Sequence, residues 1–343
     1  MTERLELHYL KRKKAQISPG RLCLGWLGIF CLFLMLKNSS IAMEYITRGL
    51  RLCAKTVIPS LFPFMVISDL ILSSGLGETL LRPIAPVCCR LLRLPQVGCY
   101  AVIMGLLCGF PIGARCAISA LKANQMTEEE VLRVLLFSTN PSAAFLINAV
   151  GASLWGNQRF GMALFASVLL SQILSGLLLT YVFCKKEHDL SSQANTTSSE
   201  KAPTISLTRQ FTQAIGSAST GILLICAYVV FFSALSGTVN LVLEGVGAPS
   251  SLKVMIACIL ELSGGASAAC GLAQPLFAAL LCAFAAGWGG ISVHCQLMSV
   301  CDGFRLKFST YLLAKLLQSI LCALLLWGML SADPTLLIRG IPY

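Results

Sequence analysis

Three ionisable side chains occur in parts of this sequence that otherwise consist of apolar residues and glycine. Arg115 follows the segment GFPIGA, Glu261 ends an apolar run in MIACILELSGG, and His294 lies in GWGGISVHCQ. An ionisable side chain is expensive in apolar surroundings, so each is a candidate for function. The planar guanidinium of Arg115 suits a carboxylate, and an imidazole titrates near neutral pH. We therefore predict that Arg115 attracts an anion and that Glu261 and His294 provide proton or ion coupling.

Each of these residues also has a structural interpretation. Arg115 could anchor its segment at a membrane surface, and Glu261 could form a salt bridge or a hydrogen bond. A buried His294 could simply be hydrogen-bonded. Extended or broken backbone would project His294 and Gln296 to one side, whereas a helix would separate them.

Glycine and proline cluster at four places along the chain. The clusters are CGFPIGA (108–114), STNPSAAFL (138–146), ELSGGASAACG (261–271) and GWGGISVHCQ (287–296). Gly and Pro interrupt helices and free backbone groups that hydrocarbon cannot satisfy, so such breaks face protein or a wet cavity. The half-helices that follow can hold an anion at their N-termini. Ordinary kinks and close helix contacts are the alternative, because Gly is common in membrane helices.

The breaks supply the predicted binding residues. Asn140, followed by Pro141 and Ser142, is typical of a helix break with its own cap, a role that is compatible with solute contact. The residues predicted to bind solute are Gly109, Pro111, Gly113, Arg115, Asn140, Ser142, Ser263, Gly264 and Gln296.

The elements that must position these residues are membrane helices. Hydrophobic residues make up 56% of the chain and charged residues 12%, with a mean hydropathy of +0.78, far from the balance of a soluble protein. A straight helix needs about 20 apolar residues to cross a bilayer, and about four or five apolar stretches could cross alone. The expected fold class is an all-α polytopic membrane protein with an N-terminal transmembrane helix.

The net charge of +11 is concentrated where it favours membrane topology over nucleic-acid binding. Lys11–Lys14 and Arg21 precede the first apolar run, and such basic flanks stay in the cytoplasm. We expect a cytoplasmic N-terminus in a bacterial plasma membrane, with the lipid bilayer and no nucleic acid as partner. A cleaved signal peptide competes with this interpretation, because the basic region, a short apolar run and the small residues Ser40 and Ala42 fit that pattern.

No cofactor or catalytic motif is recognisable. Most of the 16 cysteines lie in apolar segments, where they serve as packing residues, and Cys88 and Cys89 have neither a second pair nor a nearby His for a metal. A nucleophile–base set and the Lys of a phosphate loop are both missing from the sequence motifs. We expect no cofactor, no bound metal and no enzymatic activity; a lipid-modifying membrane enzyme is the form that an exception would take.

A polar stretch divides the chain into two blocks with the same order of features. Each block has a first helix, a glycine-rich break, a second break about thirty residues later and an unbroken final helix. Paired breaks in corresponding positions predict two pseudo-symmetric inverted repeats with broken or re-entrant helices. The predicted divisions are a basic N-terminus with the first transmembrane helix (1–40), a first membrane repeat (41–184), a polar linker (185–208) and a second membrane repeat with the C-terminal tail (209–343).

Two of the segments carry a family resemblance. Cys108–Trp155, together with Gly287–Gln296 and its His-x-Gln pattern before the last helix, resembles the YlbJ-like family of sporulation integral membrane proteins, within the nucleoside-recognition or Gate superfamily. The resemblance covers roughly Ala42 to Leu330. It implies a relation to the membrane core of concentrative nucleoside transporters and a link to dipicolinate movement during spore formation. The substrate-binding motifs of those transporters are not recognisable here, so neither nucleoside nor sodium is carried over.

These observations predict a membrane transporter that works by alternating access. The expected solute is a small organic anion or heteroaromatic metabolite, dipicolinate-like or nucleoside-like, with H+ or Na+ as the coupling ion. The alternative is a membrane assembly or signalling factor that retains the Gate fold without transporting a solute.

Overall fold

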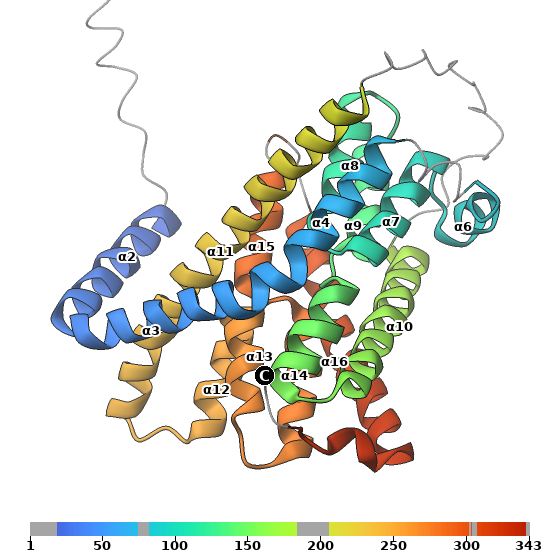
Figure 1. Cartoon of the computed structure of the whole chain (residues 1–343). Helices are drawn as coiled ribbons and strands as arrows, with labels where there is room; N and C mark the ends of the chain where they lie inside the picture. The colour runs from blue at the N-terminus through green and yellow to red at the C-terminus, as the bar shows by residue number, and fades with distance from the viewer. Residues whose placement is uncertain (1–18, 75–81, 184–205, 302, 304–306, 341–343) are drawn as a thin grey trace, which may run out of the picture.

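The computed structural model describes residues 19–74, 82–183, 206–301, 303 and 307–340 (Figure 1). Within these residues the secondary structure is helical, with no strand. Five helical stretches are long and apolar enough to cross a membrane, and a pair bent by 96° between α6 and α7 would make a sixth. The prediction of an all-α polytopic membrane protein is confirmed. The five stretches are Ser39–Ile71, Gln158–Val182, Thr208–Gly245, Pro275–Val300 and Phe308–Ala332.

The predicted N-terminal helix is present, but its apolar part is short. Helix α2 (Pro19–Lys37) contributes only the apolar stretch Gly25–Lys37, below the length of the five spans. Its apolar side chains are exposed, as with Trp26, 66% of whose surface is accessible. The basic segment Lys11–Lys14 lies outside the described residues.

The first half starts with one continuous helical stretch and then breaks twice. Helices α7 and α8 form hairpin 1, whose tip is Gly109–Pro111, and α9 with η2 forms broken helix 1, interrupted between Ser138 and Phe145. The elements are α3 (Ser39–Leu52), η1 (Cys53–Val57), α4 (Ile58–Ser73), α6 (Ala85–Leu92), α7 (Gln96–Cys108), α8 (Ile112–Lys122), α9 (Glu128–Ser138), η2 (Phe145–Trp155) and α10 (Gln158–Phe183).

The second half repeats this order. Helices α12 and α13 form hairpin 2 with Glu261 at its tip, and α14 with α15 forms broken helix 2, interrupted at Gly289. The elements are α11 (Leu207–Gly245), α12 (Ser250–Leu260), α13 (Leu262–Cys270), α14 (Pro275–Trp288), α15 (Gly290–Val300), α16 (Phe308–Ala332) and η3 (Pro334–Leu337).

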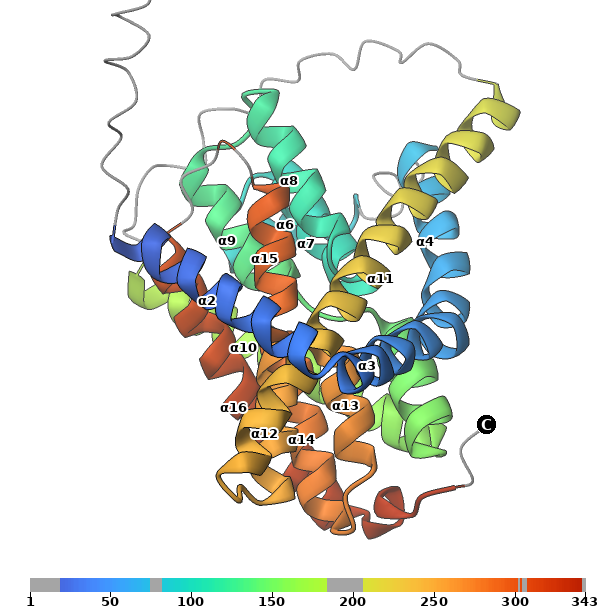
Figure 2. The same ribbon diagram turned by 90° about the vertical axis from the view of Figure 1, so that its left-hand side faces the viewer.

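The two halves run in opposite directions. In Figures 1 and 2, hairpin 1 comes from the upper end of the molecule and hairpin 2 from the lower end. The long helix α10 runs upward where its counterpart α16 runs downward. This arrangement agrees with the predicted inverted repeats. Residues 185–205 of the predicted linker lie outside the described residues, and α11 begins at Leu207.

Local sequence signals account for where the elements start and stop. Thr127 and Glu130 form a capping box at the start of α9, where the Thr127 Oγ1 accepts from the Glu130 N–H and the Glu130 carboxylate accepts from the Thr127 N–H at 2.7 Å. Helix α14 ends at Gly289, whose φ of 86° is readily available only to glycine.

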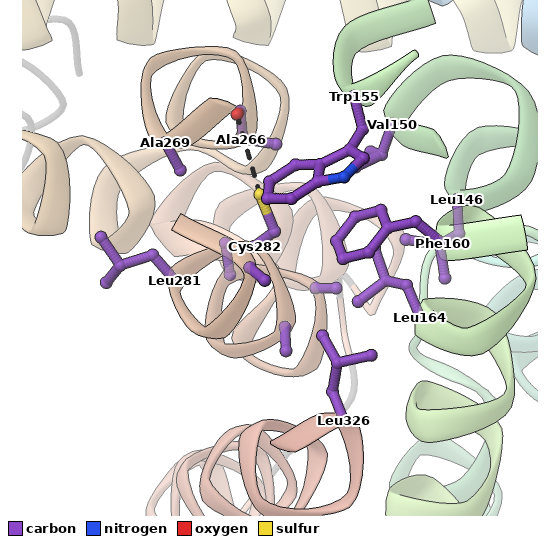
Figure 3. Close-up of a cluster of buried hydrophobic side chains, with 14 of the residues drawn as sticks. Leu146, Val150, Trp155, Phe160, Leu164, Ala266, Ala269, Leu281, Cys282 and Leu326 are labelled. Carbon is purple, nitrogen blue, oxygen red and sulfur yellow. Dashed lines mark hydrogen bonds between the residues drawn. The ribbon is translucent and has the colours of Figure 1, made fainter. Parts of the chain in front are cut away.

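The largest buried cluster joins the two halves. Trp155 at the end of η2 stacks on Phe160 of α10, with ring centroids 4.1 Å apart, and both rings face the second-half residues Ala266 and Cys282 (Figure 3). A second cluster packs hairpin 1 and α9 against Leu297 of α15 and other second-half residues. Each broken helix is therefore held by side chains from both halves.

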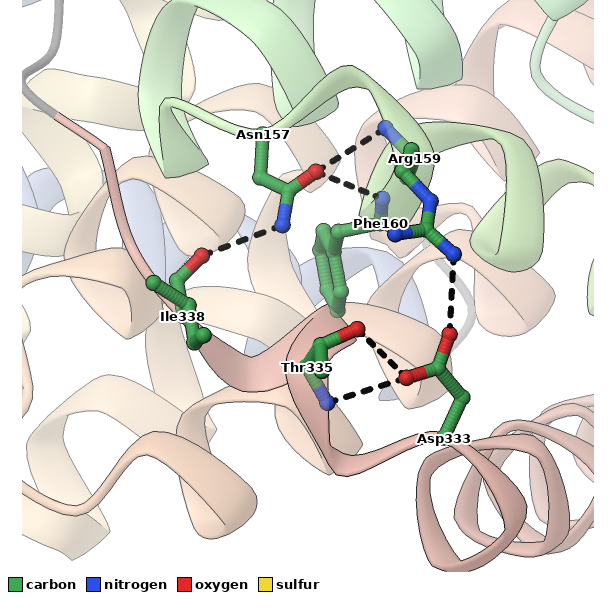
Figure 4. A network of polar contacts seen from close by, with 6 residues as sticks. All are labelled: Asn157, Arg159, Phe160, Asp333, Thr335 and Ile338. Carbon is green, nitrogen blue, oxygen red and sulfur yellow. Dashed lines mark hydrogen bonds and ion pairs between the residues drawn. The ribbon is translucent and has the colours of Figure 1, made fainter.

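The C-terminal segment crosses the lower end of the molecule as a strap, here defined as residues 333–339. Arg159 Nη2 contacts Asp333 Oδ2 at 3.0 Å, and Asn157 Nδ2 donates to the carbonyl of Ile338 at 3.1 Å (Figure 4). Arg339 donates to the carbonyl of Leu272 at 2.8 Å, in the turn between α13 and α14. The strap thus ties the start of α10 to hairpin 2.

Candidate functional site

The four helix breaks meet around one cavity. Its volume is about 70 Å³ for the centres of water-sized molecules. Hairpin 1 contributes Phe110, and hairpin 2 contributes Glu261 and its neighbours, while Leu61 of α4 and two α11 side chains close the remaining side. The lining residues are Leu61, Phe110, Thr139, Asn140, Pro141, Ser142, Phe145, Ile225, Val229, Glu261, Leu262, Ser263, Gly289, Ser292, Val293 and Gln296.

Four half-helices begin at these breaks, and η2, α13 and α15 line the cavity with residues of their first turns. The four half-helices are α8, η2, α13 and α15. Two of these ends are capped by side chains: Ser142 Oγ accepts from the N–H of Phe145 at 3.2 Å, and Glu261 accepts from Ser263 and Gly264 at 2.8 and 2.6 Å. No side-chain cap is present at α8 or α15. The positive end of α15, which lines the cavity at Gly289 and Ser292, is therefore available to an anion, whereas no residue of α8 lines the cavity.

Each hairpin tip is docked on the broken helix of its own half. In the first half, the Phe110 N–H donates to the Asn140 carbonyl at 2.8 Å, and a Cβ on Gly109 would lie 2.5 Å from the Ser142 nitrogen. In the second half, a Cβ on Gly290 would lie 2.9 Å from the Cα of Glu261. Only glycine permits approaches this close, so the glycine clusters bring backbone against backbone around the cavity.

The wall of the cavity is mostly apolar with a few fixed polar groups. Asn140 is 1% exposed, and its Oδ1 is buried without a partner among the described residues, while its Nδ2 donates to the Pro141 carbonyl at 3.3 Å. Ser292 and Gln296 add polar groups from α15, and both are buried. Apolar walls with a small number of convergent polar groups are typical of small-molecule sites.

A second and larger cavity adjoins the first at Glu261. It has a volume of about 320 Å³ and lies between hairpin 2 and the helices α3 and α11. Its basic residues are already paired, Arg48 with Glu44 at 2.5 Å and Lys253 with Glu244 at 3.0 Å. Glu261 lines both cavities, so it stands at the boundary between them. No sequence pattern predicts this cavity, because it arises from the packing of α3 and α11 on hairpin 2.

The structure brings four of the nine predicted binding residues to the central cavity. The residues that line the central cavity are Asn140, Ser142, Ser263 and Gln296, together with the predicted coupling residue Glu261. Gly264 lines the second cavity. Gly109, Pro111 and Gly113 surround Phe110 at the tip of hairpin 1 without lining the cavity themselves, so they position the tip.

Arg115 and His294 do not reach the cavity. Arg115 is half-buried on α8 and lines neither cavity. His294 is buried, and its Nδ1 lies 3.1 Å from the hydroxyl of Tyr311. The helix α15 carries His294 and Gln296 two residues apart, which points them in different directions. Extended backbone, which would have placed both on one side, is therefore the wrong interpretation at this position.

The capping role predicted for Asn140 belongs to Ser142. The Ser142 Oγ accepts from the N–H of Phe145 at the start of η2, whereas the Asn140 side chain bonds the adjacent Pro141 carbonyl. The reason is spacing, because a capping oxygen must lie two or three residues before the N–H that it accepts from.

One buried cation at the breaks was missed by the sequence interpretation. Lys315 lies in α16, is 1% exposed, and donates to the carbonyl of Thr139 and to Gln318 Oε1, each at 2.6 Å. The available signal was a lone Lys inside the apolar run TYLLAKLLQS.

The chain is similar to a sporulation membrane protein in sequence and to a transporter in structure. No protein-family model matches the chain. The chain is 23% identical over 334 residues to the sporulation integral membrane protein YlbJ of Bacillus subtilis (strain 168), covering 87% of this chain and 81% of YlbJ. It also matches the solved structure of CNTnw in an inward-facing substrate-bound state, with a TM-score of 0.51 and 11% identity over 92% of this chain and 87% of that one. The resemblance inferred from the sequence is confirmed: the chain is an integral membrane protein related to a sporulation membrane protein, and it has the fold of a nucleoside transporter.

Proposed function

We propose that this protein transports a small organic anion or heteroaromatic metabolite across the bacterial plasma membrane by alternating access. The observation that carries the proposal is the convergence of four helix breaks on one cavity. Discontinuous helices meeting at mid-depth between inverted repeats are the usual construction of a transporter's substrate site. The relation to YlbJ further supports a role in spore formation.

The cavity offers complementary contacts to such a solute. The uncapped N-terminus of α15 favours a carboxylate. The rings of Phe110 and Phe145 can pack against a planar heteroaromatic ring, and the Gln296 amide can donate to its oxygen or nitrogen atoms. The carboxylate of Glu261 already occupies the N-terminus of α13, so that end is closed to an anion.

The central cavity is small in the present conformation. A volume of about 70 Å³ holds a few water molecules and no heteroaromatic dicarboxylate. A solute therefore needs a hairpin tip to move. The larger cavity beyond Glu261 gives hairpin 2 a space on its outer side, so we assign hairpin 2 as the moving gate on that side.

The test is uptake into proteoliposomes that contain the purified full chain. The probes are radiolabelled dipicolinate for the anion class and uridine for the nucleoside class. Gln296→Met keeps the side-chain length and removes the amide, so uptake of the transported probe should fall about 5- to 150-fold, the loss expected for one hydrogen bond worth about 1–3 kcal/mol. Arg115→Gln is the matched control, because Arg115 lies outside both cavities.

The outcomes separate this proposal from its rivals. Uptake of neither probe, combined with tight binding of one, would favour a membrane assembly or signalling factor that retains the fold. Chemical conversion of a probe during uptake would favour an enzyme, which we do not propose. If Arg115→Gln abolishes uptake and Gln296→Met retains it, the solute binds at the α8 face of hairpin 1 and not in the central cavity.

A further inference from the structure

The carbonyl of Thr139 is freed by the break in helix 1. Residue 139 follows the end of α9, and the chain then passes through Asn140 and Pro141 before η2 begins at Phe145. In a continuous helix this carbonyl would accept from an N–H four residues later. Inside a membrane a freed carbonyl needs a donor or a cation, because hydrocarbon supplies neither.

Lys315 supplies both to this carbonyl. Its Nζ lies 2.6 Å from the Thr139 oxygen and 2.6 Å from Gln318 Oε1. These distances are at the short end for charge-assisted hydrogen bonds from an ammonium. Among the described residues, no carboxylate lies within 4.0 Å of Lys315, so its ammonium forms hydrogen bonds to these two uncharged oxygens and no ion pair.

The other elements packed on α16 face Lys315 with few titratable groups. His294 of α15 and Cys322 of α16 interact with it electrostatically, and Tyr311 lies one turn away. The buried polar residues of α10 are all uncharged, and one of them, Gln172, donates to the Leu136 carbonyl at 2.5 Å. Helix α14 and η3 contain no Asp, Glu, Lys, Arg or His. The charged residues of α9, Glu128–Glu130 and Arg133, lie in its first two turns, at the opposite end from Thr139.

We infer that the Lys315 ammonium is the cation that broken helix 1 uses to satisfy its freed carbonyl, in the place where another protein could bind Na+. The amine of Lys315 then takes up and releases a proton during the transport cycle. An inorganic cation would need the Thr139 carbonyl that the ammonium already occupies, and it would be repelled by that charge at close range. Thr139 and the adjacent Asn140 line the central cavity. Loss of the proton therefore weakens the bond that fixes the backbone at the cavity wall.

The coupling part of this inference rests on the proposed transport function, whereas the identity of the cation does not. Two measurements keep these apart. The first compares the unfolding temperature of the purified full chain in about 0.15 M NaCl and about 0.15 M choline chloride. The wild type should show no difference. In Lys315→Ala the oxygens of Thr139 and Gln318 lose their donor and a space opens, so Na+ should raise the unfolding temperature of this variant relative to choline.

The second measurement is dipicolinate uptake from about pH 5 to about pH 8 with either a proton or a Na+ gradient. A proton gradient, and not a Na+ gradient, should increase the rate of uptake by the wild type. In Lys315→Met this increase should be smaller by about tenfold or more, which is the effect of losing one charge-assisted hydrogen bond. Lys307→Met is the matched control, because Lys307 is exposed at the start of the same helix and should retain the wild-type response.

Two results would overturn the inference. One is a wild-type unfolding temperature that rises with Na+ as much as that of Lys315→Ala. The other is a wild-type proton response in Lys315→Met. If the wild type takes up no dipicolinate in either gradient, transport of this solute is refuted, and the unfolding comparison alone decides whether Lys315 is the cation of the break.

Discussion

Replacing Gly113 by Ala tests whether hairpin 1 is docked on broken helix 1. Gly113 lies within α8, where its backbone is helical and alanine is otherwise favourable. A Cβ at this position would lie 2.6 Å from the Ser138 Cβ and 2.9 Å from the Cα of Gly105. Ser138 belongs to α9 and Gly105 to α7, and both contacts are at or next to the backbone, so α8 has to move away from both helices.

The magnitude follows from two opposing effects. Gly→Ala in a helix gains about 1 kcal/mol of propensity, and overpacking of a tight contact costs about 1–3 kcal/mol, occasionally more. Gly328→Ala in α16 isolates the first effect, because a Cβ there meets no atom within 4 Å. Gly113→Ala should therefore be about 1–3 kcal/mol less stable than Gly328→Ala.

The assay is thermal unfolding of detergent-purified protein, followed with a thiol-reactive fluorophore that labels the buried cysteines as they become exposed. Ser138→Gly added to Gly113→Ala removes the Cβ that is struck and should recover part of the loss. If Gly113→Ala is as stable as Gly328→Ala, hairpin 1 does not pack tightly on broken helix 1, and the first half does not contribute to a shared cavity in this way.

Three further predictions concern other parts of the fold. Thr127→Ala removes the capping box of α9 and should cost about 0.5–2 kcal/mol in the free energy of unfolding, whereas Thr220→Ala, an exposed mid-helix hydroxyl, should cost less. Trp155→Ala should cost about 3–5 kcal/mol or prevent accumulation of folded protein, because it empties the cluster in Figure 3, and Trp155→Phe should recover part of the loss. The Thr335 hydroxyl and amide and the Arg159 guanidinium lower the pKa of Asp333 below its usual value, so its contribution to stability is present above that usual value and is lost as the pH falls through the lowered one. Asp333→Asn should accordingly destabilise the protein at neutral pH, with the difference from wild type shrinking in acid; an equal difference at both pH values would contradict the assignment.

The order of the elements and the positions of the breaks could be predicted from the sequence because both depend on local composition. Apolar stretches fixed the spans, and Gly and Pro fixed the four interruptions. Asn140, Ser142, Glu261 and Gln296 are adjacent to those interruptions, so predicting the breaks also predicted their place at the cavity.

The direction in which a helical residue points could not be predicted in the same way. Arg115 follows the break closely in sequence, but the rotation of α8 keeps it from the cavity, and α15 turns His294 away from Gln296 toward Tyr311. Lys315 contacts Thr139, which is 176 positions away. Such a pairing arises from the packing of α16 on α9 and leaves no pattern in either segment.

The length of α11 has a consequence for the surrounding lipid. Its 39 residues extend about 58 Å at 1.5 Å per residue, against about 30 Å of hydrocarbon in an ordinary bilayer. The stretch Ser39–Ile71, which packs beside it, is also longer than a perpendicular crossing requires. Both must tilt, extend past the headgroups or thicken the bilayer locally, and each of these responses to hydrophobic mismatch depends on acyl-chain length. The two helical stretches that close one side of the central cavity, through Leu61, Ile225 and Val229, are the longest of the five spans, so we expect bilayer thickness to influence the shape of the site.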